Sequence, residues 1–172
     1  YLKNIMGLWM IQSVKKELGR DKSYGEICSE ASKADIHSIV DCNDPRFLAP
    51  LSMTAEVQNA CRESGQQVPE GIAQVAAVIY HSLARCYAKT AQELQLLTGC
   101  TYGQIHVVGG GANADYLNAL TANETGKQVL TGPVEATAAG NLAIQLIAAG
   151  ELQNLNEARA CIAESFPIGR YS

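Results

Sequence analysis

Three consecutive glycines, Gly109–Gly111, are the residues whose type and spacing most clearly suggest chemistry. They follow the apolar, β-branched segment 104–108 and precede residue 113, where a helix is predicted to begin. Because glycine has no Cβ, the backbone N–H groups of such a turn can approach an anion, and a helix N-terminus favours negative charge. The turn could hold a phosphate group. The glycines could equally serve only as a tight connection between strand and helix, and these residues alone do not separate the two interpretations.

The spacing of the glycines excludes two common classes of nucleotide site. The segment does not match GxGxxG, and no Lys-Ser or Lys-Thr pair follows it, as a Walker A loop would require. We therefore do not expect a dinucleotide-binding Rossmann domain or a P-loop NTPase.

The cysteines and histidines lack the spacing of a metal site. Cysteine occupies positions 28, 42, 61, 86, 100 and 161, and histidine positions 37, 81 and 106. Structural zinc needs closely spaced ligand pairs, so we predict no metal site in this chain. A chain with a large core needs no disulfide framework, which favours reduced thiols and a cytoplasmic location. His106 alternates with apolar residues and is predicted to lie in the core, while Tyr80 and His81, on a predicted helix, are expected to have a structural or surface role and not a catalytic one.

The composition describes one folded domain with few charges. Of the 172 residues, 47% are hydrophobic and 17% are charged, and the net charge is −4. This excludes global disorder and disfavours a nucleic-acid partner. The uncharged stretch 94–114 is interrupted by Gly, Thr and Gln, so it does not predict a membrane span. Such a low charged fraction suits a chain that packs against another part or partner.

Apolar spacing and capping residues predict the elements that position the turn. Helices are expected at 2–18, 21–33, 52–64, 69–99, 113–125, 135–149 and 155–164, and buried strands at 104–108 and 127–130. Residues 38–51 are expected to be irregular. The order of strand, helix, strand and helix is typical of an α/β domain with a short parallel sheet and right-handed crossovers.

Two short parallel strands do not form an independently stable sheet. Further strands would have to lie within residues 36–51 or before Tyr1. The chain starts at an amphipathic pattern without an initiator Met, so we interpret residues 1–172 as a single-domain fragment of a longer protein. Because an open strand edge attracts partners, we also expect the fragment to self-associate, to bind its N-terminal complement, or to be ordered only as part of a longer polypeptide.

Three segments, taken together in this order and spacing, resemble the C-terminal domain of the FGGY carbohydrate kinases. They are YLKNIMGLWMIQ at 1–12, VVGGGA at 107–112 and GPVEATAAGN at 132–141. Within the family, the segments FLAPLSM at 47–53, CRESG at 61–65 with VPE at 68–70, and GPVEA at 132–136 look most like the L-rhamnulose kinases. The resemblance covers nearly the whole chain.

The resemblance implies an actin-like, ribonuclease-H-like ATPase domain, the nucleotide-binding half of a kinase that uses ATP and Mg²⁺. It places Gly109, Gly110 and Gly111 on the phosphate and ribose side of ATP or ADP, and Ala112 and Asn113 beside the adenosine. In the family, the catalytic base and the phosphate loops lie in segments outside this chain. We therefore expect no catalytic residue here, Mg²⁺ held mainly elsewhere, and no activity from the fragment alone.

Three positions depart from the family pattern. The family often has Asn or Ser where this chain has Ala114, Gln at Ala119 and Asp at Asn123, so the glycine backbone carries the implied nucleotide contacts. The implied reaction is phosphorylation of a ketose, L-rhamnulose, to its 1-phosphate, with the sugar bound by an N-terminal domain. L-Fuculose and xylulose remain alternative substrates. A non-catalytic actin-like regulatory or interaction module is the alternative class of function.

Overall fold

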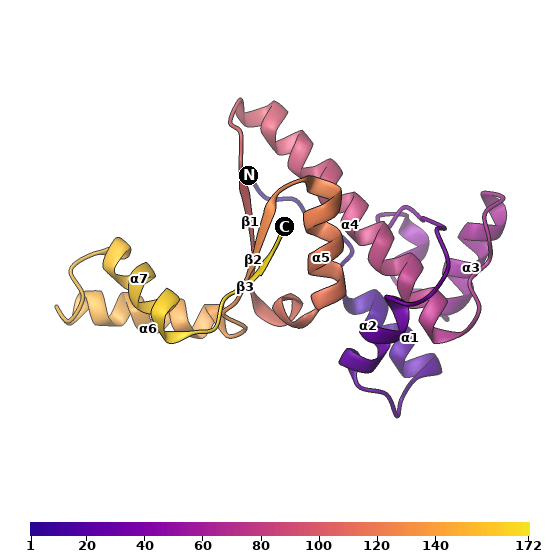
Figure 1. The fold of residues 1–172 in the computed structure, drawn as a ribbon, viewed down its shortest axis with the longest axis horizontal. Coiled ribbons are helices and arrows are strands. Elements are labelled where there is room, and N and C mark those ends of the chain that lie inside the picture. The colour runs from indigo at the N-terminus through magenta and orange to yellow at the C-terminus, as the bar shows by residue number, and fades with distance from the viewer.

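The computed structural model describes all 172 residues as a helical body, a small sheet and a projecting pair of helices (Figure 1). The body is built on α4 (Gly71–Thr98), whose 28 residues span about 42 Å. Helices α1 (Trp9–Leu18), α2 (Tyr24–Ala31) and α3 (Met53–Glu63) pack against it. The predicted long helix is confirmed. It ends at Gly99, whose φ of +67° is the left-handed conformation that glycine favours after a helix.

The core lies between these four helices. Its largest fully buried side chains are Phe47, Met10, Ile11, Ile27, Ile36 and Met53, together with Ile79 and Leu83 from α4. Burial of a side chain of this size contributes about 1.5–3 kcal/mol to the free energy of unfolding. The helical body therefore provides the rigid support for the elements that follow.

Capping side chains set the starts of α2 and α3: α3 begins where the sequence predicted it, and α2 begins at Tyr24, later than the predicted start at residue 21. Ser23 accepts a hydrogen bond from the Glu26 N–H, and Glu26 accepts one from the Ser23 N–H, which is a capping box. Ser52 likewise accepts from the Ala55 N–H at the start of α3. Each bond satisfies an amide that the first helical turn leaves without a partner.

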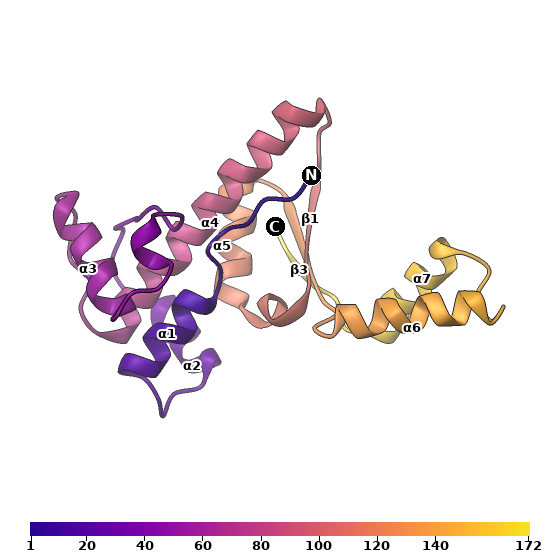
Figure 2. The ribbon, with the colours of Figure 1, turned by 180° about the vertical axis from the view of Figure 1, so that it is seen from behind.

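The first helix is shorter than predicted: α1 begins at Trp9, and residues 2–8 lie outside it. Lys3 instead forms an ion pair with Glu93 of α4, and the Met6 N–H donates to Asn43 Oδ1 at 3.3 Å. Leu2, whose spacing suggested a helical face, is 93% exposed. Contacts far along the chain thus hold this segment in an extended path from α1 past α4, which Figure 2 shows in indigo.

The sheet has the order β1-β2-β3 and is mixed. Strands β1 (Gln104–Val107) and β2 (Gln128–Thr131) are parallel, as predicted, and α5 (Asp115–Thr125) connects them. The short strand β3 (Gly169–Tyr171) pairs antiparallel with β2, which corrects the expectation of a purely parallel sheet. Its three residues are too few to produce a recognisable alternation.

Strand β1 forms the sheet edge, and its burial differs from the prediction. Gln104 and His106 are exposed, and Ile105 and Val107 are only half-buried. The expectation that β1 is buried and that His106 lies in the core is therefore wrong, because no element of this chain covers the face on which Gln104 and His106 lie. Nor do residues 36–51 supply a strand.

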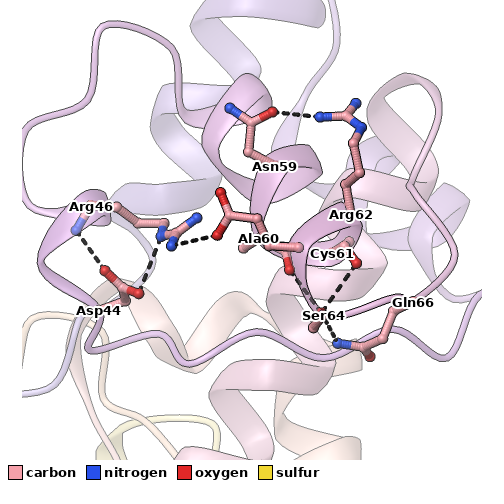
Figure 3. Close-up of polar contacts among 9 residues, drawn as sticks. Asp44, Arg46, Asn59, Ala60, Cys61, Arg62, Ser64 and Gln66 are labelled. Atoms are coloured by element: carbon pink, nitrogen blue, oxygen red, sulfur yellow. Dashed lines mark hydrogen bonds and ion pairs between the residues drawn. The ribbon is translucent and has the colours of Figure 1, made fainter.

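Residues 36–51 instead form an irregular strap that contains the 3₁₀ helix η1 (Pro45–Phe47). The Gln66 side chain pairs with both backbone groups of Ile39, accepting from its N–H and donating to its carbonyl, each at 2.8 Å. Arg46 donates to Asp44 at 3.1 Å and to Glu63 at 2.8 Å (Figure 3). Side chains such as Gln66 therefore provide hydrogen bonds to backbone groups of the strap, which neighbouring strands would provide in a sheet.

Helices α6 (Ala136–Ala148) and α7 (Leu155–Ser165) contact each other and project from the rest of the chain (Figures 1 and 2). We call this pair the arm. Ala143 and Ala158 are its only buried residues, while Leu142, Ile144 and Leu155 are more than half exposed. The arm thus presents an apolar surface without a partner in this chain.

Candidate functional site

The glycine turn forms one wall of a cleft of about 590 Å³. Residues 109–113 make the 3₁₀ helix η2 directly after β1, and α5 follows it. The cleft runs between this turn and the helical body. Its lining comprises Leu8, Ile11, Gln12, Tyr24, Gly25, Cys28 and Tyr80 from the body, and Gly110, Gly111, Asn113 and Ala114 from the turn.

The three glycines serve different purposes. Gly109 has a φ of +74°, which side-chain-bearing residues rarely adopt, and its N–H donates to the Pro133 carbonyl at 3.3 Å. A Cβ on Gly111 would lie 3.4 Å from Val107 Cγ1 and 3.8 Å from Leu8 Cδ1, which are ordinary contact distances, so Gly111 packs beside these two side chains but packing does not demand a glycine there. Only the glycine at 109 is a requirement of the fold.

Gly110 has no such structural requirement. It is exposed, its φ is ordinary, and a Cβ added to it would meet no atom within 4 Å. It nevertheless lines the cleft. The space beside Gly110 is therefore open to a ligand that approaches the backbone, which is compatible with the phosphate-binding alternative that the sequence left open.

The predicted nucleotide residues do not all face the cleft. Gly110, Gly111 and Asn113 line it together, whereas Gly109 does not. Ala112 is 8% exposed and is not among the lining residues, so its side chain contributes packing.

A buried amide, Asn118 of α5, holds the turn in place. Its Nδ2 donates to the carbonyls of Gly111 and Ala112, each at 3.2 Å. Asn118 is 2% exposed. Asn118 was not among the predicted site residues, although a polar side chain on the apolar face of a predicted helix is a signal that could have indicated it.

A second compartment of about 400 Å³ continues the cleft along α5. The two share Gly25, Cys28 and Asn113 in their linings. Of the three positions that depart from the family pattern, Ala114 lines the first compartment and Ala119 the second. Asn123 is exposed and lines neither.

The lining of the first compartment is uncharged. No Lys, Arg, Asp or Glu lines the first compartment. Burial raises the pKa values of Cys28 and Tyr80, so both stay protonated near neutral pH. An anion in the first compartment would therefore meet only uncharged donors, such as backbone N–H groups and the side-chain amides of Gln12 and Asn113, while the apolar walls could cover an uncharged ring.

Behind the cleft, aromatic packing connects α4 to α5. Tyr80 packs edge-on against Tyr116, with ring centroids 5.9 Å apart, and His81 Nε2 lies 2.7 Å from Tyr116 Oη. Burial lowers the pKa of His81 and thereby favours its neutral form. The expected structural role of Tyr80 and His81 is consistent with these contacts.

The opposite wall includes residues to which the sequence analysis assigned no role: Leu8, Ile11 and Gln12. They lie in or just before α1 and line the first compartment. The available signal was that all three fall in the segment 1–12 on which the resemblance rested.

Neither clustered metal ligands nor a membrane-spanning helix is found. No group of three or more His, Cys, Asp or Glu side chains is placed to hold a metal ion. None of the helices combines the length and apolar character needed to cross a membrane.

Comparison with known proteins identifies the family. Residues 1–149 match the sequence model described as the FGGY family of carbohydrate kinases, C-terminal domain. The chain belongs to the FGGY family. It accordingly has the actin-like, ribonuclease-H-like fold of the FGGY C-terminal domain, which confirms the predicted fold class.

Several curated relatives carry the name rhamnulokinase. The chain is 44% identical to that of Bacillus subtilis (strain 168) over 169 residues, which is 98% of the chain and 35% of the relative. It is 46% identical to that of Klebsiella pneumoniae subsp. pneumoniae over 161 residues, 94% of the chain and 33% of the relative. It is 45% identical to that of Enterococcus faecalis over 174 residues, which is 99% of the chain and 35% of the relative. The chain thus spans about a third of the length of these FGGY relatives.

Proposed function

We propose that this chain is the nucleotide-binding part of an ATP-dependent kinase that phosphorylates L-rhamnulose to L-rhamnulose 1-phosphate. The observation that carries the nucleotide assignment is that Gly110 lines the cleft and borders open space, although neither packing nor its φ requires a glycine at that position. Membership of a carbohydrate kinase family supports a sugar as the phosphoryl acceptor.

In this proposal the turn binds the phosphate end of ATP or ADP. The exposed backbone of Gly110 and the close-packed backbone of Gly111 approach the phosphates, and Asn113 lies beside the nucleoside, further along the cleft. Gly109 and Ala112 act indirectly, because they fix the conformation of the turn. Asn118 restrains the same carbonyls and so keeps the turn preorganised for its ligand.

Phosphoryl transfer needs charge neutralisation by a metal and a base for the sugar hydroxyl. No cluster of side chains in this chain fits a metal by itself. We therefore propose that Mg²⁺, the base and the sugar are held mainly by segments outside residues 1–172. We also propose a cytoplasmic location, which the unpaired cysteines favour. The chain contributes binding and orientation of the nucleotide.

L-Rhamnulose is favoured as the substrate because the similar relatives named above are rhamnulokinases. L-Fuculose and xylulose are alternative ketoses for a kinase of the same family. A non-catalytic actin-like regulatory module is the alternative class, and the alanines at 114 and 119, where the family often has polar residues, favour it.

A coupled assay of ADP formation tests the proposal. The complete protein that contains this chain is incubated with ATP, Mg²⁺ and each of the three ketoses. We expect the highest kcat/KM with L-rhamnulose. A higher value with another ketose would contradict the substrate assignment, and ATP binding without turnover on any ketose would favour the regulatory module.

A further inference from the structure

Asp115 and Tyr171 form a hydrogen-bonded pair on the wall of the second compartment. Tyr171 Oη donates to Asp115 Oδ1 at 2.7 Å, and both residues line the space of about 400 Å³. Asp115 is the first residue of α5, and Tyr171 ends β3, opposite Val129 of β2. The pair therefore joins the C-terminal strand to the helix that follows the glycine turn. Tyr171 lies beyond residues 1–149, the part that matches the family model.

The bond orients the Asp115 carboxylate. Burial and the neighbouring Asp115 raise the pKa of Tyr171, so its phenol keeps the proton that it donates. Tyr171 is the only side chain that donates to Asp115, and it takes one carboxylate oxygen. An ionised carboxyl group accepts several hydrogen bonds, so Oδ2 keeps its capacity to accept from a ligand.

The second compartment differs chemically from the first. Besides Asp115, its lining carries the hydroxyls of Ser29 and Ser32 and the small side chain of Ala119, with no Lys or Arg. A carboxylate in a space without cations repels a phosphate group and favours a neutral group that can donate a hydrogen bond. Because the glycine turn faces the first compartment, the two compartments match the two chemically different ends of a nucleotide.

We propose that Asp115, positioned by Tyr171, accepts a hydrogen bond from the nucleoside end of the nucleotide and selects ligands that carry a donor there. This inference rests on the proposed function. In ATP, the suitable donors are the 6-amino group of adenine and the ribose hydroxyls. Asp115 is then a specificity residue, and Tyr171 a positioning residue that acts through it.

Calorimetry on the complete protein with four nucleotides tests this inference. ATP is compared with ITP, which lacks the 6-amino group, and with 2′-deoxy-ATP and 3′-deoxy-ATP, which each lack one ribose hydroxyl. We expect Asp115→Ala to bind ATP about tenfold more weakly, the usual effect of losing a hydrogen bond to a charged group. The variant should also lose the wild-type preference for ATP over the analogue that lacks the contacting donor.

Two further variants make the result specific. Tyr171→Phe keeps the ring and removes only the hydroxyl, so it should reduce the same preference by a smaller factor, and it tests the inference even if Asp115→Ala does not fold. Glu56→Ala removes a carboxylate from the first turn of α3, away from both compartments, and should bind all four nucleotides as the wild type does.

The outcomes separate this inference from the proposed function. If the wild type binds ATP and both cleft variants keep its affinity and preference, the role of Asp115 is overturned while the nucleotide site stands. If the wild type does not bind ATP, the proposed function itself fails, and the inference fails with it.

Discussion

Asn118 shows how one buried side chain can fix a binding turn. We expect Asn118→Ala to lower the free energy of unfolding by about 1–3 kcal/mol, because the carbonyls of Gly111 and Ala112 lose a buried donor. Urea unfolding of the complete protein measures this. Asn123→Ala, an exposed change on the same helix, should stay within about 0.5 kcal/mol of the wild type. Equal effects of the two changes would rule out the proposed restraint.

Single residues were predicted from sequence only in part. The glycines at 109–111 indicated a turn, but only the structure separates Gly109, with its positive φ, from Gly111, which packs beside Val107 Cγ1, and Gly110, which borders open space. These contacts leave no trace in the local pattern. His106 was misplaced because alternation shows which side chains share a face, not whether another element covers that face.

At the scale of elements, Glu17 of α1 connects two helices. Its carboxylate accepts from the backbone N–H groups of Met53 and Thr54, at 2.7 and 3.0 Å, and from Ser52 Oγ at 2.9 Å. Burial raises the pKa of Glu17, but these bonds together outweigh it and hold the pKa below its usual value of 4.5. The ionised form is thus stabilised by folding.

We therefore expect Glu17→Gln to lower the free energy of unfolding at pH 7 by up to about 1 kcal/mol, since Glu17 is exposed and solvent screens it. The wild-type advantage should be fully present above pH 4.5 and decrease as the pH falls through the lower pKa of the folded state. Urea unfolding at several pH values measures it. Glu56→Gln, in the first turn of α3, lacks these bonds and should show a smaller difference; a pH-independent advantage would refute the assignment.

The prediction of elements succeeded where the sequence carries local signals. The predicted start of α3 at residue 52 was right because Ser52 satisfies an amide three residues away, and the predicted end of α4 at Gly99 was right because that glycine adopts the left-handed φ itself. The start of α1 was predicted too early because Lys3 pairs with Glu93, 90 residues away. Strand β3 was missed because its pairing with β2 defines it, rather than a repeating pattern.

At the scale of the whole molecule, two surfaces of the chain have no partner. The outer edge of β1 is unpaired, and the arm exposes Leu142, Ile144 and Leu155. We expect the isolated 172-residue chain to self-associate or to bind the rest of the protein, and to lack kinase activity. Light scattering over a range of concentrations, with an ATPase assay, measures both. A stable monomer of 18.3 kDa with sugar-dependent ATP turnover would contradict this expectation.

The most direct test of the nucleotide assignment is the affinity of the complete protein for ATP after Gly110→Val. A branched side chain there enters open space in the cleft, so the fold should be kept. Gly103→Val is the matched control, because Gly103 also has an ordinary φ and no atom within 4 Å of an added Cβ, yet it does not line the cleft. We predict that calorimetry shows at least about tenfold weaker ATP binding for Gly110→Val, with sugar binding and the Gly103→Val control unchanged. Unchanged ATP affinity in a folded Gly110→Val protein would mean that the turn is structural only.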